Sequence, residues 1–194
     1  MKKIITIIAL IAMTATATAQ VKFGARLGGG LGSVSKDIHA DHYEGQGTGK
    51  HGNFSTYYGG FTMEVPASEK WLLDIELNYI FLGVVGEGST ILHNVNVPLA
   101  IKYDISGFRP KVGLYASYIP AVTSFEDEQH SLTKNDLKKF DYGATFGLEY
   151  NFTEKFYIEA NFNLGLANLL KEDSRHSSDY LRNRILFLGV GYRF

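Results

Sequence analysis

Imidazole and carboxylate side chains gather in one polar segment of the chain, where their chemistry could serve to bind a metal ion. The segment contains Asp37, His39, Asp41, His42, Glu44 and His51. Both groups are ligands of divalent transition metals. Their spacing matches no defined metal motif, and glycines at positions 45, 47, 49 and 52 interrupt the segment. His39, His42 and His51 are therefore weak metal candidates, and we expect no bound metal or other cofactor.

Other histidines lie beside hydroxyl groups and could supply parts of a catalytic site. They are His93, His130 next to Ser131, and His176 next to Ser177 and Ser178. A hydroxyl nucleophile needs a base held within hydrogen-bond distance, and no such pair stands at a defined strand spacing. The run of glycines at 28–30 lacks the Lys-Ser/Thr that follows in a phosphate-binding loop. We therefore expect a protein that is not an enzyme.

The sharpest chemical pattern is a set of charged residues that recur on one face of alternating segments. The acids are Glu64, Asp74, Glu76, Asp141, Glu149 and Glu159, and the bases are Lys22, Arg26, Lys102, Lys111 and Arg193. The two signs nearly balance. Because a buried charge is costly unless it is paired, this face predicts an interior salt-bridge network. A path for protons or small ions along the same residues is the alternative.

The elements that carry these charges are predicted from alternation with a period of two residues, which is typical of β-strands. Between 156 and 168, for example, Phe156, Ile158 and Phe162 alternate with Glu159 and Asn161. The same pattern recurs in segments 21–33, 57–65, 71–85, 91–105, 111–123, 140–152 and 185–194. The chain therefore predicts an all-β fold of eight strands.

The connections between these segments alternate in length. Segments 66–70, 106–110 and 153–155 are tight turns, whereas 36–54, 124–138 and 169–181 are long and polar, and 86–89 is the one short connection on the long side. An even strand number with short turns at one end and long loops at the other is typical of outer-membrane barrels. No segment after the N-terminus is apolar enough for a transmembrane helix.

The uncharged face of the strands is expected to contact lipid. It carries aromatic residues near the tight turns, namely Trp71, Tyr103, Tyr150, Phe152, Tyr192 and Phe194, which predict a girdle at the membrane interface. A soluble, lipocalin-like barrel with the apolar face inside is the alternative. An eight-stranded barrel is only wide enough for its own side chains, so the sequence predicts a filled lumen.

The N-terminus has the features of a secretory signal peptide. Lys2 and Lys3 precede an apolar run at 4–13, and Ala17-Thr18-Ala19 forms a small-residue cleavage site. We expect cleavage after residue 19, which leaves the barrel domain at 20–194. The absence of cysteine excludes disulfides and thiol chemistry, and the net charge of −1 gives no reason to expect a nucleic-acid partner.

Several motifs resemble the PorT-like outer membrane β-barrel proteins of Bacteroidetes. They are Val21-Lys22-Phe23-Gly24-Ala25-Arg26-Leu27-Gly28, Asn96-Val97-Pro98-Leu99-Ala100-Ile101-Lys102-Tyr103, the Asp141–Tyr150 run, Gly165–Asn168 and the terminal Gly191-Tyr192-Arg193-Phe194. The resemblance covers the mature chain and implies a barrel in the outer membrane. It also implies that Phe194 is a signal for the barrel assembly machinery, and some members of the family are linked to secretion or gliding.

Together these observations predict an eight-stranded antiparallel up-and-down transmembrane β-barrel with a filled lumen. We expect a monomer in outer membrane lipid that displays its extracellular loops, with other envelope proteins as partners. The alternatives are an accessory component of protein secretion in the PorT manner and a narrow pore or small-ligand barrel.

Overall fold

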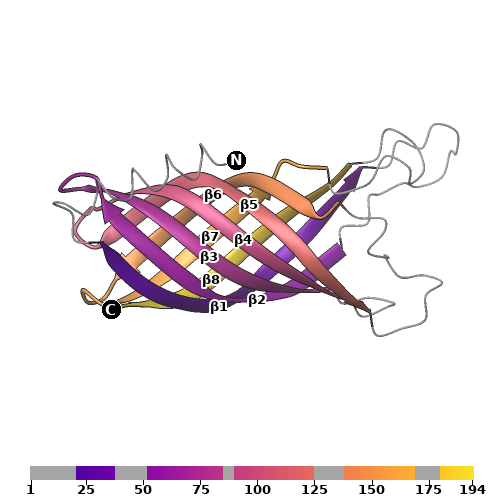
Figure 1. The fold of residues 1–194 in the computed structure, drawn as a ribbon, viewed down its shortest axis with the longest axis horizontal. Helices are drawn as coiled ribbons and strands as arrows, with labels where there is room; N and C mark the ends of the chain where they lie inside the picture. Colours follow the sequence, from indigo (N-terminus) through magenta and orange to yellow (C-terminus); the bar gives the residue numbers. More distant parts are fainter. Residues whose placement is uncertain (1–20, 38–51, 85–89, 125–137, 169–179) are drawn as a thin grey trace, which may run out of the picture.

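The computed structural model is a closed, all-antiparallel barrel of eight strands, as the alternation predicts, and it describes residues 21–37, 52–84, 90–124, 138–168 and 180–194. Figure 1 shows the strands wound obliquely around one axis. In chain order they are β1 (Lys22–Asp37), β2 (Gly52–Pro66), β3 (Trp71–Val84), β4 (Thr90–Tyr103), β5 (Phe108–Ser124), β6 (Phe140–Asn151), β7 (Phe156–Gly165) and β8 (Tyr180–Arg193). The predicted His39, His42 and His51 lie outside the described residues.

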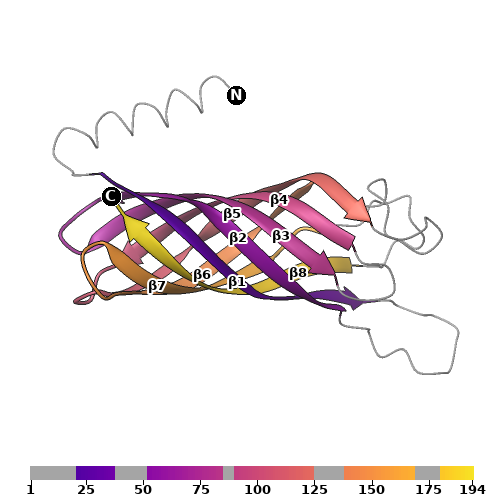
Figure 2. The ribbon, with the colours of Figure 1, turned by 90° about the horizontal axis from the view of Figure 1, so that it is seen from below.

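The barrel closes where the first and last strands meet. β1 pairs with β8 from Gly24 opposite Arg193 to Asp37 opposite Tyr180. Closure leaves no unpaired strand edge, which is the condition for placing a sheet where no water can satisfy its backbone. The C-terminus lies at the end of the barrel that carries the short turns, here called the turn end (Figures 1 and 2).

The predicted strand ends needed correction, most clearly at the turn between β4 and β5. Hydrogen bonds between Ile105 and Phe108 close a two-residue hairpin in which Ser106 has φ 54° and Gly107 has φ 93°. A type I′ turn requires positive φ at both central residues, and glycine adopts it without strain. Residues 108–110, predicted as turn, therefore belong to β5, and Arg109 joins the barrel wall.

Asp104 supports this hairpin from the turn end. Its carboxylate accepts a hydrogen bond from the Gly107 backbone N–H at 3.0 Å and one from Arg109 Nε at 2.6 Å. Partial burial raises the pKa of Asp104, but these two hydrogen bonds and the charge of Arg109 outweigh it and hold the pKa below its usual value. The carboxylate thus stays ionised beside its guanidinium partner.

The two faces of the sheet have opposite chemistry. Phe23, Leu27, Leu114 and Phe140 lie on the outer surface with more than half of their area exposed, whereas Glu64, Asp74 and Lys102 are buried inside. This arrangement is the reverse of the soluble, lipocalin-like alternative. The described part of the chain contains no helix of the length and apolar character needed to span a membrane.

Aromatic rings pair on the outer surface at the turn end, where the sequence predicts a girdle. The centroids of Trp71 and Tyr103 are 4.7 Å apart, and Tyr192 packs 4.8 Å from Phe156 and 5.9 Å from Phe194. Tyr118 and Phe140 form a corresponding pair, 5.1 Å apart, near the opposite end. Two aromatic bands that flank an apolar wall are the arrangement expected at two membrane interfaces.

The outward position of Leu114, near the middle of β5, predicts a strong effect of charge at that site. In a lipid bilayer, Leu114→Arg should lower the free energy of unfolding by roughly 2–4 kcal/mol, because the guanidinium would face hydrocarbon. Urea unfolding of the barrel refolded into vesicles measures this difference. Glu154→Arg, in an exposed turn, is the control and should change little. Equal stabilities for the two variants would contradict the lipid-facing assignment.

Candidate functional site in the barrel interior

The inward side chains form three layers along the barrel axis, and β3 passes through all of them. From the turn end its inward residues are Leu72, Asp74 and Glu76, then Asn78, then Ile80 and Leu82. The acids belong to the interior ion network, defined as Arg26, Glu64, Asp74, Glu76, Lys102, Arg109, Lys111, Glu149, Glu159 and Arg193. The next two layers are an amide layer (Asn78, Asn94, Asn96, Asn161 and Asn163, with Ser117 and Thr145) and an apolar cluster (Phe54, Tyr58, Ile80, Leu82, Ile185 and Phe187).

Glu64 and Glu149 form the centre of the network nearest the turn end. Lys102 Nζ lies 2.7 Å from Glu64 and 2.8 Å from Glu149. Arg193 Nε donates to Glu64 at 2.8 Å, and its Nη2 pairs with Glu149. Arg109 Nη1 approaches both carboxylates at 3.4 Å and links the group to Asp104 at the rim.

Asp74 joins this group to a second one deeper in the barrel. Its Oδ2 lies 3.1 Å from Lys102 and 3.6 Å from Lys111. Lys111 in turn contacts Glu76 at 2.5 Å and Glu159 at 3.8 Å. Arg26 completes the group through an ion pair with Glu76 and a 2.8 Å contact with Glu159. The ion pairs therefore form one continuous network.

Charge balance explains how so many ionised groups can be buried. The network contains five cations and five carboxylates, and all except Arg109 have side chains at most 3% exposed. An isolated buried ion would cost several kcal/mol in lost hydration, which only close and well-oriented partners offset. Guanidinium groups supply several such hydrogen bonds at fixed angles.

Glycines in β8 make room for two inward tyrosines that fill the space around the network. A Cβ at Gly191 would collide with the Tyr157 ring, and one at Gly189 would collide with the Tyr58 hydroxyl. The freed space lets Tyr157 lie 4.2 Å from the Arg193 guanidinium and Tyr58 lie 5.1 Å from that of Arg26. Tyr58 also donates a 2.5 Å hydrogen bond to Glu159. Rings and ions together close the cross-section.

The structure brings most of the predicted charged residues together but places two elsewhere. Lys22 is exposed, because it is the first residue of β1 and lies at the barrel mouth. Asp141 is buried, but it lies beyond the network and accepts a 3.1 Å hydrogen bond from Tyr115. Arg109 also belongs to the network, although its segment is predicted as a turn; it shares the alternation of Lys111.

The catalytic candidates do not assemble in the described residues. His93 lies on the outer wall, where its Nδ1 is 2.9 Å from the Tyr79 hydroxyl and its Nε2 is 3.3 Å from the Thr123 hydroxyl. Its ring also packs against Phe81 at 5.5 Å. His130, His176 and their neighbouring serines lie outside the residues that the structure describes.

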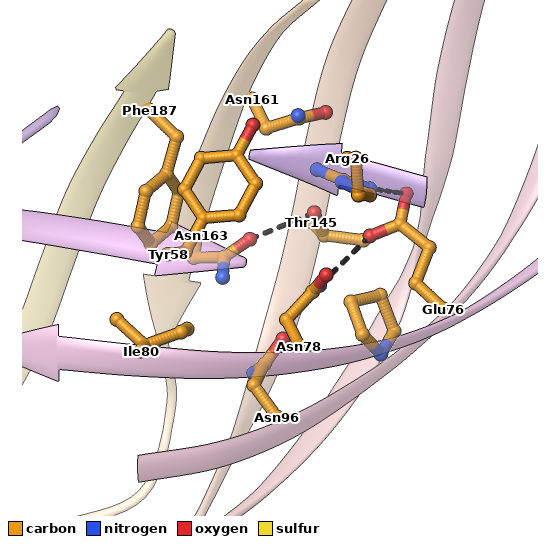
Figure 3. A pocket seen from close by; sticks show the side chains of 11 residues that line it. Arg26, Tyr58, Glu76, Asn78, Ile80, Asn96, Thr145, Asn161, Asn163 and Phe187 are labelled. Carbon is orange, nitrogen blue, oxygen red and sulfur yellow. Dashed lines mark hydrogen bonds and ion pairs between the residues drawn. The ribbon is translucent and has the colours of Figure 1, made fainter. Parts of the chain in front are cut away.

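The interior has little free space. Its amide layer contains a cavity of about 10 Å³, lined by residues that include Arg26, Tyr58, Asn78 and Asn161 (Figure 3). That volume is close to the minimum needed for one water molecule. The chemistry of this interior is therefore that of a structural ion cluster.

Glu64 pairs with three cations of the network, Lys102, Arg109 and Arg193, so its loss should destabilise the barrel strongly. Glu64→Gln should lower the free energy of unfolding by about 3–5 kcal/mol, because Lys102 and Arg193 would remain buried with fewer negative partners. Urea unfolding in lipid vesicles measures the change. Glu69→Gln, in the exposed turn before β3, is the matched control and should stay within about 0.5 kcal/mol of the parent. Equal effects at the two positions would show that the network adds no stability.

The chain is similar to solved structures of several bacterial proteins. Neisserial surface protein A superposes with a TM-score of 0.61 at 12% identity, covering 90% of this chain and 99% of its own. Ail, the attachment invasion locus protein of Yersinia pestis, gives 0.44 at 11% identity, over 88% and 98% of the two chains. Outer Membrane Protein W of E. coli gives 0.41 at 19% identity, over 91% and 100%. The first of these similarities supports the fold.

Sequence comparison identifies the family directly. No curated protein matches the chain. The family model described as "Outer membrane protein beta-barrel domain" matches residues 5–194, which is nearly the whole sequence. The chain belongs to the outer membrane protein β-barrel domain family.

Proposed function

We propose that this barrel is a non-catalytic anchor in the outer membrane that presents the long connections at its far end to partners outside the cell. The observation that carries the proposal is the continuous interior ion network, whose balanced and mutually paired charges fill the lumen at the turn end. Such an interior suits a rigid scaffold, whereas a transport path needs sites that release what they bind.

The position of the long connections supports this division of roles. Three of them, predicted from sequence at 36–54, 124–138 and 169–181, join strands at the end opposite the turns. Connecting segments on a rigid scaffold are where binding residues concentrate. The filled lumen therefore directs the search for partners, most simply other envelope proteins, to this end of the barrel. We further propose that the protein acts as a monomer.

A filled lumen predicts that the protein does not conduct ions. The purified protein should give no steady current in planar bilayers, because the paired charges between Arg26 and Arg193 and the rings of Tyr58 and Tyr157 together fill the cross-section. The double variant Tyr58→Ala/Tyr157→Ala is the matched comparison. It exposes the glycine-lined wall of β8 and should produce measurable current steps. Steady conductance by the parent protein would favour the narrow-pore alternative and refute the anchor proposal.

A finer assignment is to the PorT-like group, with an accessory role in protein secretion as the second candidate function. Its support is the strand motif at 96–103, which contains Lys102, a central member of the network. Co-purification from native membranes separates the two functions, since a secretion accessory should recover other secretion components in stable stoichiometry. Recovery of the barrel alone would count against that role.

Export and assembly give a separate prediction about the two ends of the chain. We propose that the chain is cleaved after residue 19, so the protein isolated from outer membranes should begin at Gln20 by mass spectrometry. We also propose that Phe194 is read by the barrel assembly machinery. Phe194→Ala should then reduce the heat-modifiable, folded form, whereas Phe152→Ala, also in the girdle, should not. An uncleaved chain, or equal effects of the two substitutions, would contradict these assignments.

A further inference from the structure

Unsatisfied polar atoms concentrate around the small cavity of the amide layer. Among the described residues, nine buried side-chain nitrogen or oxygen atoms lack a hydrogen-bond partner. Five of them belong to residues that line this cavity: Arg26 Nε, Asn78 Oδ1, Asn96 Oδ1, and Asn161 Nδ2 and Oδ1. All four residues are at most 5% exposed. Buried polar groups in folded proteins are nearly always paired, so this concentration requires an explanation.

The neighbouring contacts fix these residues in place. Arg26 is held by ion pairs to Glu76 and Glu159 through its terminal nitrogens, which leaves Nε as the remaining donor. Asn78 Nδ2 donates to Glu76 at 3.0 Å, so its oxygen is the remaining acceptor. Figure 3 shows Arg26, Asn78 and Asn161 around the same space, with Tyr58 and Phe187 on another side.

From this geometry we infer that the cavity is a binding site for one ordered water molecule. Two of the three amide oxygens can accept its two hydrogens, and Arg26 Nε–H and Asn161 Nδ2–H can donate to its oxygen. Water both donates and accepts, and a buried water typically makes two to four such bonds. The cavity volume of about 10 Å³ suits a ligand of that size.

The charges beside the cavity favour a neutral ligand over an ion. The Arg26 guanidinium lines the cavity and would repel a cation, and the Glu76 carboxylate lines it as well and would repel an anion. Their mutual pairing leaves no net charge for an ion to neutralise. The water would thus join the interior ion network to the amide layer by hydrogen bonds.

Magnetisation transfer from water tests the site in the intact barrel. The labelled full chain in lipid nanodiscs should show direct cross-relaxation from water protons to Arg26 Nε–H and Asn161 Nδ2–H. Asn94 Nδ2–H is the internal control, since Asn94 is equally buried in the amide layer but does not line the cavity. Cross-peaks at the first two positions and none at Asn94 are expected. Their absence at Arg26 and Asn161 would overturn the proposal.

The substitution Asn161→Leu gives a second test. The direction of the change in melting temperature distinguishes a hydrated cavity from a dry one. With water bound, Asn161→Leu removes two of its partners and should lower the melting temperature by about 2–4 °C. In a dry cavity the same change removes two unpaired polar atoms and should raise it. Asn94→Leu, which loses the hydrogen bond from Ser117, calibrates the loss of one internal bond.

Ion dependence separates water from a cation. The melting temperature should be the same in sodium, potassium and choline chloride at equal ionic strength, and a selective rise with one cation would overturn the proposal in favour of a cation site. If Asn161→Leu does not fold, the magnetisation transfer experiment on the unmodified chain decides the question alone.

Discussion

The mutual pairing of charges inside the barrel is the constraint on which the rest of the structure depends. Every strand supplies at least one member of the interior ion network, from Arg26 in β1 to Arg193 in β8. Each carboxylate at its centre serves more than one cation, so no strand can shift its register without separating several pairs. A shift of one residue would also turn the charged face toward lipid. Strand register, barrel closure and charge balance therefore depend on one another.

Alternation in the sequence is enough to predict the strand number and the orientation of each face, because a closed barrel repeats its inside-outside pattern at every second residue. Glu149 and Glu159, for instance, stand opposite each other across β6 and β7, and each lies one residue from an outward aromatic or β-branched neighbour. The partners of a given charge are harder to predict, since they depend on the stagger between strands. Arg193 and Glu64 meet across 129 residues, a distance over which no local pattern carries information.

Each wrong residue assignment has a specific physical cause. Arg109 was missed because the hairpin at Ser106-Gly107 is tighter than the sequence suggests, which moves three residues into β5. Lys22 follows the correct alternation, but it lies at the turn end of the barrel, where an inward position does not bury the side chain. The apolar cluster was not predicted as a unit, since an inward Ile80 and an outward Leu77 look alike until the barrel diameter and stagger are known.

The order of the three layers also affects the strength of the ion pairs. The ions lie toward the turn end, the amides follow, and the apolar cluster lies nearest the long connections. Apolar side chains on that side lower the local polarisability, which strengthens the attraction between ion pairs below them. Amides between the two zones supply dipoles that can orient toward the charges without adding net charge.

The place of Arg193 in the last strand of the barrel has a consequence for synthesis. A chain emerging from the ribosome holds Glu64 and Glu149 long before it holds the guanidinium that pairs with both. A barrel that lacks its last strand would bury two carboxylates short of a partner and leave both edges of the sheet open. Addition of β8 therefore completes the ion pairs as well as the strand pairing that closes the barrel. A chain that lacks β8 is therefore expected to be less stable in lipid than the complete barrel, because it loses these ion pairs and the pairing of β8 with β1 and β7.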